Sequence, residues 1–438
     1  MCALPFEGET MLMRFGVSNF RSIRDYQELS LVASALKDPG TDLIETSGIR
    51  EKLLPVAMIY GANASGKSTI LRAISFLKGA VIYSNERSSP TSKIPRFPFA
   101  LSEGYREQPT RVDCDFLLDN VRYHFGFVAR DDFFEEEWLF AFPEGNRRKW
   151  YHRKHGERIS FGKHFRGKNQ AIAALTRPNS LFLSSAAQNA HEQATIIFRF
   201  FENMFSRVVT AALNHDALAN ELRDGIDRRI LEFLQLADTG ITGGRVREIP
   251  LPDQVNKVVA RFKDVAAEEF SDVALNLPGP KATLSLSHSA GQGSNGDVFF
   301  ELASESRGTL RLLKLLRPVF SALDEGATVL VDEIDASVHT LLSKAILELF
   351  SSRKTNPKGA QLIATTHDTT LLCSKILRRD QIWFTEKDLN GATSLYPLSD
   401  IRTRQSDNLE KGYLEGRFGA IPFLGDLNKL LDEEVPAS

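Results

Sequence analysis

The sequence lacks the features that would assign the protein to a disulfide-rich, metal-binding or membrane class. Only three cysteines occur among 438 residues, Cys2, Cys114 and Cys373, and their odd number and wide spacing match neither a disulfide framework nor a metal site. No apolar run reaches the roughly 18 residues that a membrane span needs, and the N-terminus has no basic-then-apolar secretory pattern. We therefore expect reduced thiols and a cytoplasmic protein without a membrane partner.

The sequence also lacks an excess of positive or negative charge, and it lacks coiled-coil repeats. The 54 Lys and Arg residues nearly balance 56 Asp and Glu residues, and the net charge of −2 excludes a global attraction to nucleic acid or anionic membranes. No sustained heptad pattern predicts a coiled-coil arm. Hydrophobic residues at 42% and charged residues at 25% are ordinary for a globular protein.

One strong motif is present, Gly-Ala-Asn-Ala-Ser-Gly-Lys-Ser over residues 61–68. It lies between a strand-like apolar run and a helix-like run, which is the context of a phosphate-binding loop; the alternative is a glycine-rich turn with an exposed lysine. Lys67 can contact the β- and γ-phosphates of ATP, and the Ser68 hydroxyl can ligate Mg²⁺. The glycines let backbone N–H groups approach an anion. The predicted nucleotide-binding residues here are Gly61, Asn63, Ser65, Gly66, Lys67, Ser68 and Thr69.

A short apolar run over 328–331 predicts a buried strand that ends at Asp332 and Glu333. A carboxylate at the end of a central strand can hold Mg²⁺, and the next one can polarise a water for attack on the γ-phosphate. Without the phosphate-binding loop, these residues would be an ordinary acidic strand end. With it, we interpret them as a Walker B motif, in which Asp332 serves the metal and Glu333 is the general base.

A second apolar run, 361–365, leads to His367, which at the tip of a strand beside Walker B can donate to the γ-phosphate. A single histidine is more often structural, but its place after the other two motifs favours the functional interpretation. Upstream, Ser306 and Gly308 stand at the predicted start of a helix, where a hydroxyl and backbone N–H groups can meet an anion. Taken alone, Ser306 would be a helix cap.

The region between these motifs has two expected parts. Residues 101–188 are rich in strand-like runs, with a hairpin turn predicted at Asp119-Asn120, and suggest an accessory lobe. Residues 189–295 show apolar spacing of three and four, which predicts a helical insertion. The other expected segments are an N-terminal extension over 1–10 and the two parts of an ATPase core over 11–100 and 296–438.

The segment Arg147–Lys168 carries nine Lys or Arg residues against a single Glu157, with aromatic residues interleaved. Such a segment can grip the phosphate backbone of DNA or RNA and stack on bases. The alternative is a solvated face that balances the acidic run over 131–137. Its histidines lack a ligand spacing, so we assign no metal to it.

The order of these motifs resembles that of the ABC-type ATPase heads of the SMC, RecF and OLD-like group, and is most similar to a bacterial AAA-type family without coiled-coil arms. The resemblance implies an α/β P-loop NTPase fold, an ABC-type head with a mixed sheet plus a β-rich and helical insertion. It spans nearly the whole chain, and the insertion is its least diagnostic part. The stretches that carry it are 19–23, 61–68, 306–308, 332–337, 364–368 and 409–413.

The family resemblance further implies a Mg²⁺-dependent ATPase that dimerises head to head. ATP bound by Lys67 and Ser68 of one chain would be capped by Ser306 and Gly308 of another, with Arg21 near the nucleotide. Residues 335–339 would communicate across the dimer. Two departures weaken the match: Ser-Arg-Gly-Thr replaces a glycine-richer signature, and His339 stands where many relatives carry an acidic or other polar residue. The Q-loop residue stays open between Gln108 and Gln188.

Relatives of this kind are often encoded beside a Toprim- or HNH-type nuclease in antiphage defence modules. About seventy residues follow His367, too few for a full Toprim domain, so we expect the effector to be a separate polypeptide. Our leading hypothesis is an ATPase subunit, a homodimer or higher oligomer, that gates this effector. The alternatives are an SMC- or RecF-like DNA-binding ATPase in repair or maintenance, and a nucleotide-gated scaffold with negligible turnover.

Overall fold

The computed structural model describes residues 9–86, 89–205, 208–250, 254–255, 257–259, 261, 281–289, 297–373 and 375–422. The chain divides into two compact units. Unit 1 comprises Met1–Thr210, Pro318–Asp335 and Thr340–Ser438, and unit 2 comprises Ala211–Arg317 and Ala336–His339. Each unit is described by itself.

A five-stranded sheet forms the centre of unit 1. Its order is β12 (Thr328–Val331), β13 (Gln361–Thr365), β3 (Val56–Gly61), β14 (Ile382–Lys387) and β15 (Thr393–Pro397). The first four strands are parallel and β15 is antiparallel, so the sheet is mixed, as predicted. Every residue of β3, β12 and β13 is buried, as expected for parallel strands covered on both faces. The carboxyl ends of these three strands meet at one edge, which brings the predicted motifs together.

A seven-stranded antiparallel sheet forms the second layer of unit 1. Its order is β2 (Gln27–Ser30), β1 (Thr10–Ser18), β4 (Thr110–Leu118), β5 (Val121–Ala129), β6 (Phe134–Phe142), β7 (Arg148–Lys154) and β8 (Ser160–Phe161). The hairpin at Asp119 and Asn120 is confirmed, and their φ angles of 49° and 62° suit a two-residue turn of the type I′ class.

The predicted accessory lobe over 101–188 is not a separate body. β4 pairs along β1 from Thr10↔Leu118 to Ser18↔Arg111, so the β-rich region continues the N-terminal sheet. This pairing joins residues about a hundred positions apart, which local strand patterns do not encode. Thr10 already belongs to β1, whereas residues 1–8 of the expected extension lie outside the described residues.

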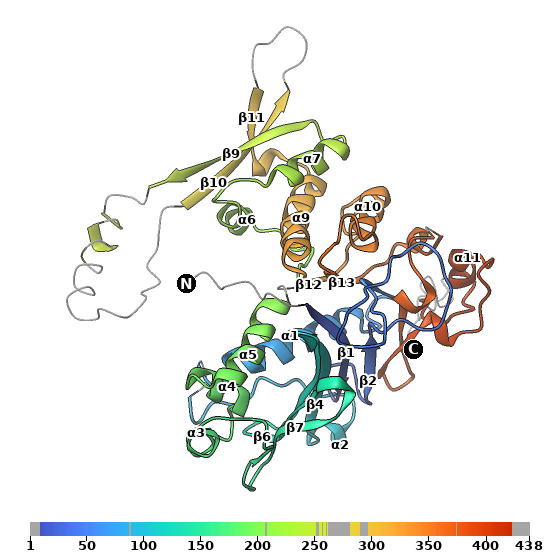
Figure 1. The fold of residues 1–438 in the computed structure, drawn as a ribbon. Coiled ribbons are helices and arrows are strands. Elements are labelled where there is room, and N and C mark those ends of the chain that lie inside the picture. Colours follow the sequence, from blue (N-terminus) through green and yellow to red (C-terminus); the bar gives the residue numbers. More distant parts are fainter. Residues whose placement is uncertain are drawn as a thin grey trace, which may run out of the picture. The chain divides into compact units, whose positions relative to one another are not determined.

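Helices cover one face of this sheet (Figure 1). They are α1 (Lys67–Tyr83), α4 (Phe182–Gln188) and α5 (Glu192–Met204), with the shorter α2 (Glu103–Arg106), α3 (Asn169–Leu175) and 3₁₀ turn η1 (Pro143–Gly145) nearby in the chain. Aromatic rings fill the interface, as where Phe116 of β4 stacks on Phe200 of α5 with ring centroids 4.0 Å apart. The core of unit 1 therefore joins both layers around α1.

The C-terminal part of unit 1 adds α10 (Thr340–Ser351), α11 (Leu409–Leu414) and the 3₁₀ turns η3 (Thr369–Cys373), η4 (Arg379–Gln381) and η5 (Leu398–Asp400). Within the stretch 409–413, Tyr413 stacks on Phe384 of β14 with centroids 5.5 Å apart, and Glu410 accepts a hydrogen bond from Thr369. This stretch thus packs against the sheet and against the turn that follows His367.

Unit 2 contains α6 (His215–Glu221), α7 (Arg228–Leu236), η2 (Leu302–Ser304) and a three-stranded sheet of β11 (Asp297–Glu301), β10 (Lys281–Ser289) and β9 (Ile241–Ile249). The helix α9 (Arg307–Glu325) begins in this unit. The expected helical insertion over 189–295 therefore contains strands after Leu236. This segment is polar and contains glycines, so its helical spacing of apolar residues is weak. Pairing between β9 and β10 therefore determines its structure. Parts of this range lie outside the described residues.

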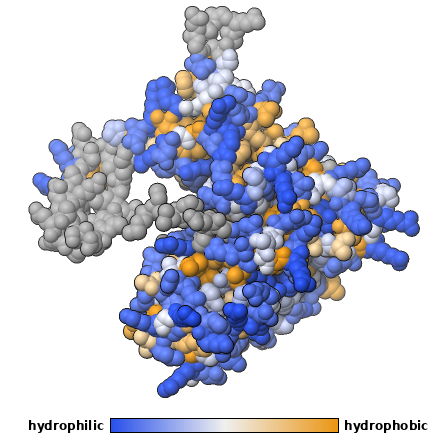
Figure 2. Space-filling model, in the orientation of Figure 1, coloured by the Kyte–Doolittle hydropathy of each residue, from blue (hydrophilic) through white to orange (hydrophobic). Residues whose placement is uncertain are grey.

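On the face shown in Figure 2, hydrophobic residues lie in separate patches among hydrophilic ones. Among the described residues, none of the helices combines the length and apolarity required to traverse a bilayer.

Candidate functional site

The phosphate-binding loop connects β3 to α1, and two glycines determine its path. Gly61 has a φ of 153°, and a Cβ there would lie 2.5 Å from the Thr385 carbonyl oxygen. Gly66 has a φ of 114°, and a Cβ there would lie 2.3 Å from Thr393 Oγ1. Both the backbone conformation and the lack of space therefore require glycine. Ala64, between them, also has a positive φ of 62°.

Lys67 is the first residue of α1 and its side chain is buried. Its Nζ donates to the carbonyl oxygens of Gly61, at 2.9 Å, and Ala62, at 3.0 Å. Burial lowers the pKa of Lys67 to about 8, although the nearby carboxylates, Glu333 first, oppose that shift. A weakly solvated cation thus lies at a helix N-terminus, where both features attract phosphate.

Ser68 contacts the Walker B residue Asp332 directly. The Ser68 hydroxyl donates to Asp332 Oδ1 over 2.8 Å, and the Thr365 hydroxyl donates to the same oxygen over 2.8 Å. A hydroxyl and a carboxylate are hard oxygen donors of the kind that Mg²⁺ prefers, with phosphate oxygens and waters completing its shell. Within the described residues, no cluster of three or more His, Cys, Asp or Glu side chains offers another metal site.

Glu333 has a left-handed backbone, with a φ of 55°. Its backbone N–H donates to Thr365 Oγ1 at 2.8 Å, and the N–H of Ile334 donates to the Thr365 carbonyl oxygen at 3.0 Å. Thr365, the last residue of β13, therefore fixes both carboxylate-bearing residues of the Walker B motif. The sequence analysis missed it, although a hydroxyl at the end of a strand predicted beside Walker B was an available signal.

His367 follows β13 at the same edge of the sheet. Its backbone N–H lies 3.3 Å from both carboxylate oxygens of Asp335, and the Thr366 hydroxyl donates to Asp335 Oδ1 at 2.8 Å. Partial burial, and then the positive charge of Lys67, lower the pKa of His367 below its usual value. The imidazole is therefore neutral near pH 7. The structure thus brings Lys67, Ser68, Asp332, Glu333 and His367 into one cluster.

Arg21 lies in the turn between β1 and β2. Its guanidinium carbon is 4.5 Å from the centre of the Phe97 ring, and its backbone has a φ of 52°. Burial, together with the charge of Arg72, lowers the pKa of Arg21 from its ordinary value.

A chain of hydroxyl groups ties this turn to the phosphate-binding loop. Ser22 Oγ lies 3.2 Å from Thr69 Oγ1 and 2.9 Å from Thr393 Oγ1, and Thr393 Oγ1 lies 2.8 Å from the Ser65 carbonyl oxygen. The Ser65 hydroxyl in turn lies 2.6 Å from Thr385 Oγ1. The turn that carries Arg21 therefore has a physical link to the phosphate-binding loop. Thr393, on β15, is a second residue that the sequence analysis missed.

The two candidate Q-loop residues lie in different places. Asn19 donates through Nδ2 to the Gln108 carbonyl oxygen at 2.8 Å, so Gln108 lies beside the turn that carries Arg21. Gln188 ends α4, whose Ser184 bonds to Ser84 just beyond the C-terminal end of α1. The 17 residues of α1 span ~25 Å, and the phosphate-binding loop lies at its other end. Position therefore favours Gln108.

The predicted signature residues lie in unit 2. Ser306 is exposed, and its hydroxyl accepts from the backbone N–H of Thr309 at 3.1 Å, which caps α9. A Cβ on Gly308 would lie 2.9 Å from the Ser337 carbonyl oxygen, so the signature lies against the loop over 336–339. Ser306 is thus a helix cap, and its exposure leaves it accessible to another chain.

The segment Arg147–Lys168 differs from the expected stacking surface. Trp150, Tyr151 and Phe165 are buried in the core, and Arg153 is buried against Glu137 with a 3.5 Å ion pair. His152 also contacts an acidic residue of β6. The aromatic rings therefore pack the fold instead of facing solvent. The cations that remain exposed from residue 154 onward are Lys154, Arg158, Lys163, Arg166 and Lys168.

Comparison with known proteins gives one family match. The family model described as "AAA domain, putative AbiEii toxin, Type IV TA system" matches residues 56–374, a range that contains the loop over 61–68, Asp332, Glu333 and His367. Among solved structures, the chain is similar to "Crystal structure of the SmcHead bound to the C-winged helix domain of ScpA", with 15% identity and a TM-score of 0.36, over 88% of this chain and 97% of that chain. No curated protein matches.

Proposed function

The chain belongs to the family described as AAA domain, putative AbiEii toxin, type IV TA system, and from this premise we propose that it is an ATP-hydrolysing subunit that dimerises around ATP and gates a separate nuclease effector in bacterial antiphage defence. The main support for the ATPase activity in this proposal is the 2.8 Å hydrogen bond between Ser68 and Asp332. It joins two motifs 264 positions apart, and a hydroxyl beside a carboxylate is the pair of oxygen donors that a nucleotide-bound Mg²⁺ would use.

The roles of the residues follow from their surroundings. Lys67, desolvated at the N-terminus of α1, would bind the β- and γ-phosphates, and Ser68 and Asp332 would hold Mg²⁺. When bound, Mg²⁺ supplies charge neutralisation at the phosphate oxygens. Glu333, held by Thr365, would accept a proton from the attacking water. His367, as a neutral imidazole, would donate a hydrogen bond to the γ-phosphate.

The exposed N-terminal end of α9 is the feature that supports the proposed dimer. The exposed Ser306 and the N-terminus of a 19-residue helix form a group that attracts phosphate. Gly308, which lies against Ser337, would let another chain's nucleotide approach this backbone closely. Communication from the capped nucleotide would then pass through the loop over 335–339.

The test is mass photometry of the Glu333→Gln protein with and without Mg²⁺-ATP, run alone and with the product of the neighbouring gene. Glutamine keeps the shape of the side chain but cannot accept the proton, so we expect ATP to be retained and the mass to double. Growth of the ATP-bound assembly with the neighbour's product supports an effector complex. A protein that stays monomeric at saturating ATP contradicts the dimer, and normal turnover of the variant contradicts Glu333 as the base.

A DNA-binding ATPase is the second candidate, and the exposed cations over 154–168 favour it. If they contact DNA, binding should weaken steeply with salt, and each phosphate contact that is removed should lower the slope of log K against log salt by about 0.9. Replacing the five cations with glutamine, and leaving the buried Arg153 intact, tests this without disturbing the core. Binding that is insensitive to both salt and these substitutions rules out the DNA-binding ATPase. Steady-state turnover separates both ATPase candidates from a nucleotide-gated scaffold.

A further inference from the structure

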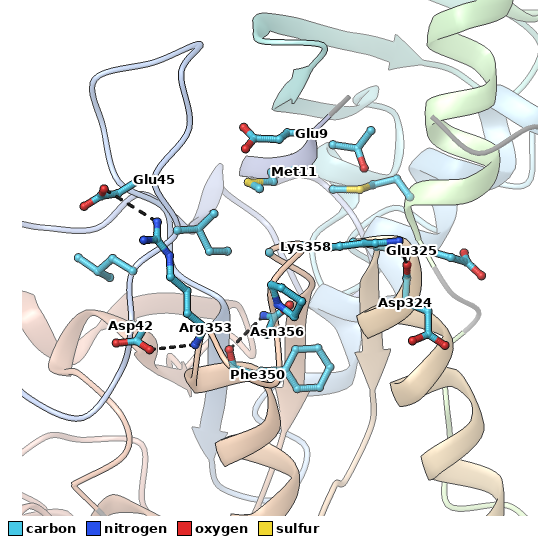
Figure 3. A pocket seen from close by; sticks show the side chains of 18 of the residues that line it. Glu9, Met11, Asp42, Glu45, Asp324, Glu325, Phe350, Arg353, Asn356 and Lys358 are labelled. Carbon is cyan, nitrogen blue, oxygen red and sulfur yellow. Dashed lines mark hydrogen bonds and ion pairs between the residues drawn. The ribbon is translucent and has the colours of Figure 1, made fainter. Parts of the chain in front are cut away.

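Unit 1 contains a cavity of about 790 Å³ that is separate from the nucleotide-binding cluster (Figure 3). Ala327 and Gly359 line it and come just before the first residues of β12 and β13, whereas Asp332 and His367 come after the ends of these strands. The five residues of β13 span ~17 Å, so the cavity opens at the opposite edge of the sheet from the phosphate-binding loop. A ligand there can bind without displacing nucleotide.

The floor of the cavity is apolar. Met11 of β1, Phe200 and Met204 of α5, and Phe350 of α10 line it, and each is at most 2% exposed. Methionine side chains are flexible and adapt to apolar groups of different shapes. These four side chains form the closed base of the cavity, and Leu43 and Ile44, which also line it and are partly exposed, offer the apolar surface that leucine-like side chains can contact.

The rim of the cavity is acidic. Five carboxylates and two cations line it, and Lys52, outside the lining, pairs with Glu45, which leaves a formal charge of −2. Arg353 lies on one side of the rim, 3.9 Å from Glu45, and Lys358 donates to the main-chain carbonyl of Asp324, as Figure 3 shows. The carboxylates are those of Glu9, Asp42, Glu45, Asp324 and Glu325.

We propose that this cavity docks a cationic, amphipathic segment of a partner protein, whose Lys or Arg side chains pair with Glu9, Asp324 and Glu325 while its apolar side chains contact Leu43 and Ile44. Charge complementarity favours a cationic protein segment as the ligand, because the same carboxylates repel nucleotides and the phosphate backbone of nucleic acids. Only the identity of the partner, which would be the effector, rests on the proposed function.

Methionine methyl groups report on this cavity. The chain has five methionines, and two of them, Met11 and Met204, lie in the floor, whereas Met58 lies in β3. The probe is a capped 12-residue peptide of lysine and leucine at helical spacing, titrated into protein with ¹³C-labelled methionine methyls in the absence of ATP. We expect the signals of Met11 and Met204, assigned with Met→Leu variants, to shift while that of Met58 stays. The same peptide with glutamate in place of lysine should shift neither.

The matched variant reverses two exposed rim charges, Asp324→Lys with Glu325→Lys. Both residues lie at or near the C-terminal end of α9, where cations are tolerated, so the fold should persist. We expect the affinity for the lysine peptide to fall about tenfold. The control reverses Glu103 and Glu107, an exposed pair outside the cavity, and should leave binding unchanged.

Three results overturn the docking site: no shift at Met11 and Met204, equal shifts with the glutamate peptide, or equal weakening by the control variant. If dilution of the protein alone moves the two signals, the occupant is a second copy of the chain and the proposal is also wrong. None of these results depends on ATP hydrolysis. A protein that binds the peptide but never hydrolyses ATP would keep the docking site and refute the proposed ATPase.

Discussion

Thr365→Val tests whether the end of β13 positions the two carboxylates, Asp332 and Glu333, that we propose take part in ATP hydrolysis. The substitution keeps the β-branched shape and removes only the hydroxyl, which donates to Asp332 Oδ1 and accepts from the N–H of Glu333, each over 2.8 Å. A hydrogen bond to a charged group contributes about 1.5–3 kcal/mol, and a buried N–H left without a partner costs about 1–3 kcal/mol. We therefore expect the free energy of unfolding to fall by about 2–4 kcal/mol.

The effect on function should exceed a simple loss of stability. Asp332 would keep Ser68 as a partner but lose the bond that orients its carboxylate, and Glu333 would lose one support of its left-handed backbone, a conformation that costs about 1–3 kcal/mol. Removing an outer-shell hydrogen bond of a metal ligand typically lowers metal affinity or activity about 10–100-fold. We expect kcat to fall and the half-saturating Mg²⁺ concentration to rise, each by a factor within that range. Nucleotide affinity measured in EDTA should change little.

The assay is steady-state ATP hydrolysis as a function of Mg²⁺ concentration, below the melting temperature of the variant. Thr365→Ser is the matched control: it restores the hydroxyl, loses one methyl group, and should return the Mg²⁺ dependence to that of the wild type. A purely structural role would lower the melting temperature without moving the Mg²⁺ dependence. If the valine variant retains wild-type kcat and Mg²⁺ half-saturation, Thr365 does not position Asp332 and Glu333.

The remaining predictions concern the loop and the dimer. Lys67→Ala should abolish ATP binding, measured by calorimetry, and unchanged affinity would refute the phosphate-binding assignment. Because burial lowers the pKa of Lys67 to about 8, the lysine is charged below that pH and neutral above it. ATP affinity in EDTA should be nearly constant between about pH 7 and 8, and should fall by up to about tenfold per pH unit above that, with proton uptake on binding. A flat profile up to pH 9.5 contradicts this. Gly66→Ala, which would place a methyl group 2.3 Å from Thr393 Oγ1, should impair ATP binding, whereas Gly79→Ala in the open part of α1 should not. Ser306→Arg should leave ATP binding intact and prevent dimerisation, as seen by light scattering with Mg²⁺-ATP; a fully active variant would exclude the composite site.

The chemistry of the candidate site was predictable because each of its residues follows a short buried strand. The expected strands over 328–331 and 361–365 coincide with β12 and β13, and the loop over 61–68 follows β3. Local apolar runs determine such strands, and parallel pairing brings their carboxyl ends to one edge. What the sequence could not supply was the pairing between distant strands, such as β1 with β4, which turned an expected accessory lobe into a continuous sheet.

The residues that hold the site in place through long-range hydrogen bonds were also difficult to predict. Thr365 contacts a residue 33 positions away, and Thr393 contacts the phosphate-binding loop across 328 positions. Nothing in the local sequence distinguishes Thr393 from other threonines in strands, and only its place at the end of a strand predicted beside Walker B marks Thr365. The basic segment misled for a related reason: part of it is strand β7, in which Tyr151 and Arg153 are buried, and Arg153 pairs with the buried Glu137 of β6.

The three threonines that touch the loop or the Walker B motif share a physical advantage. Thr365, Thr385 and Thr393 all lie in strands of the central sheet. The hydroxyls of Thr385 and Thr393 contact Ser65 of the loop, and that of Thr365 contacts Asp332 and the N–H of Glu333. A β-branched side chain suits a strand and has few rotamers, so its hydroxyl is held in position at little entropic cost. Serine would offer the same hydrogen bonds with more rotamer freedom. The geometry of the loop is therefore determined by the rigid sheet beside it, and the left-handed backbone of Glu333 persists because β13, not the Walker B turn itself, fixes its N–H.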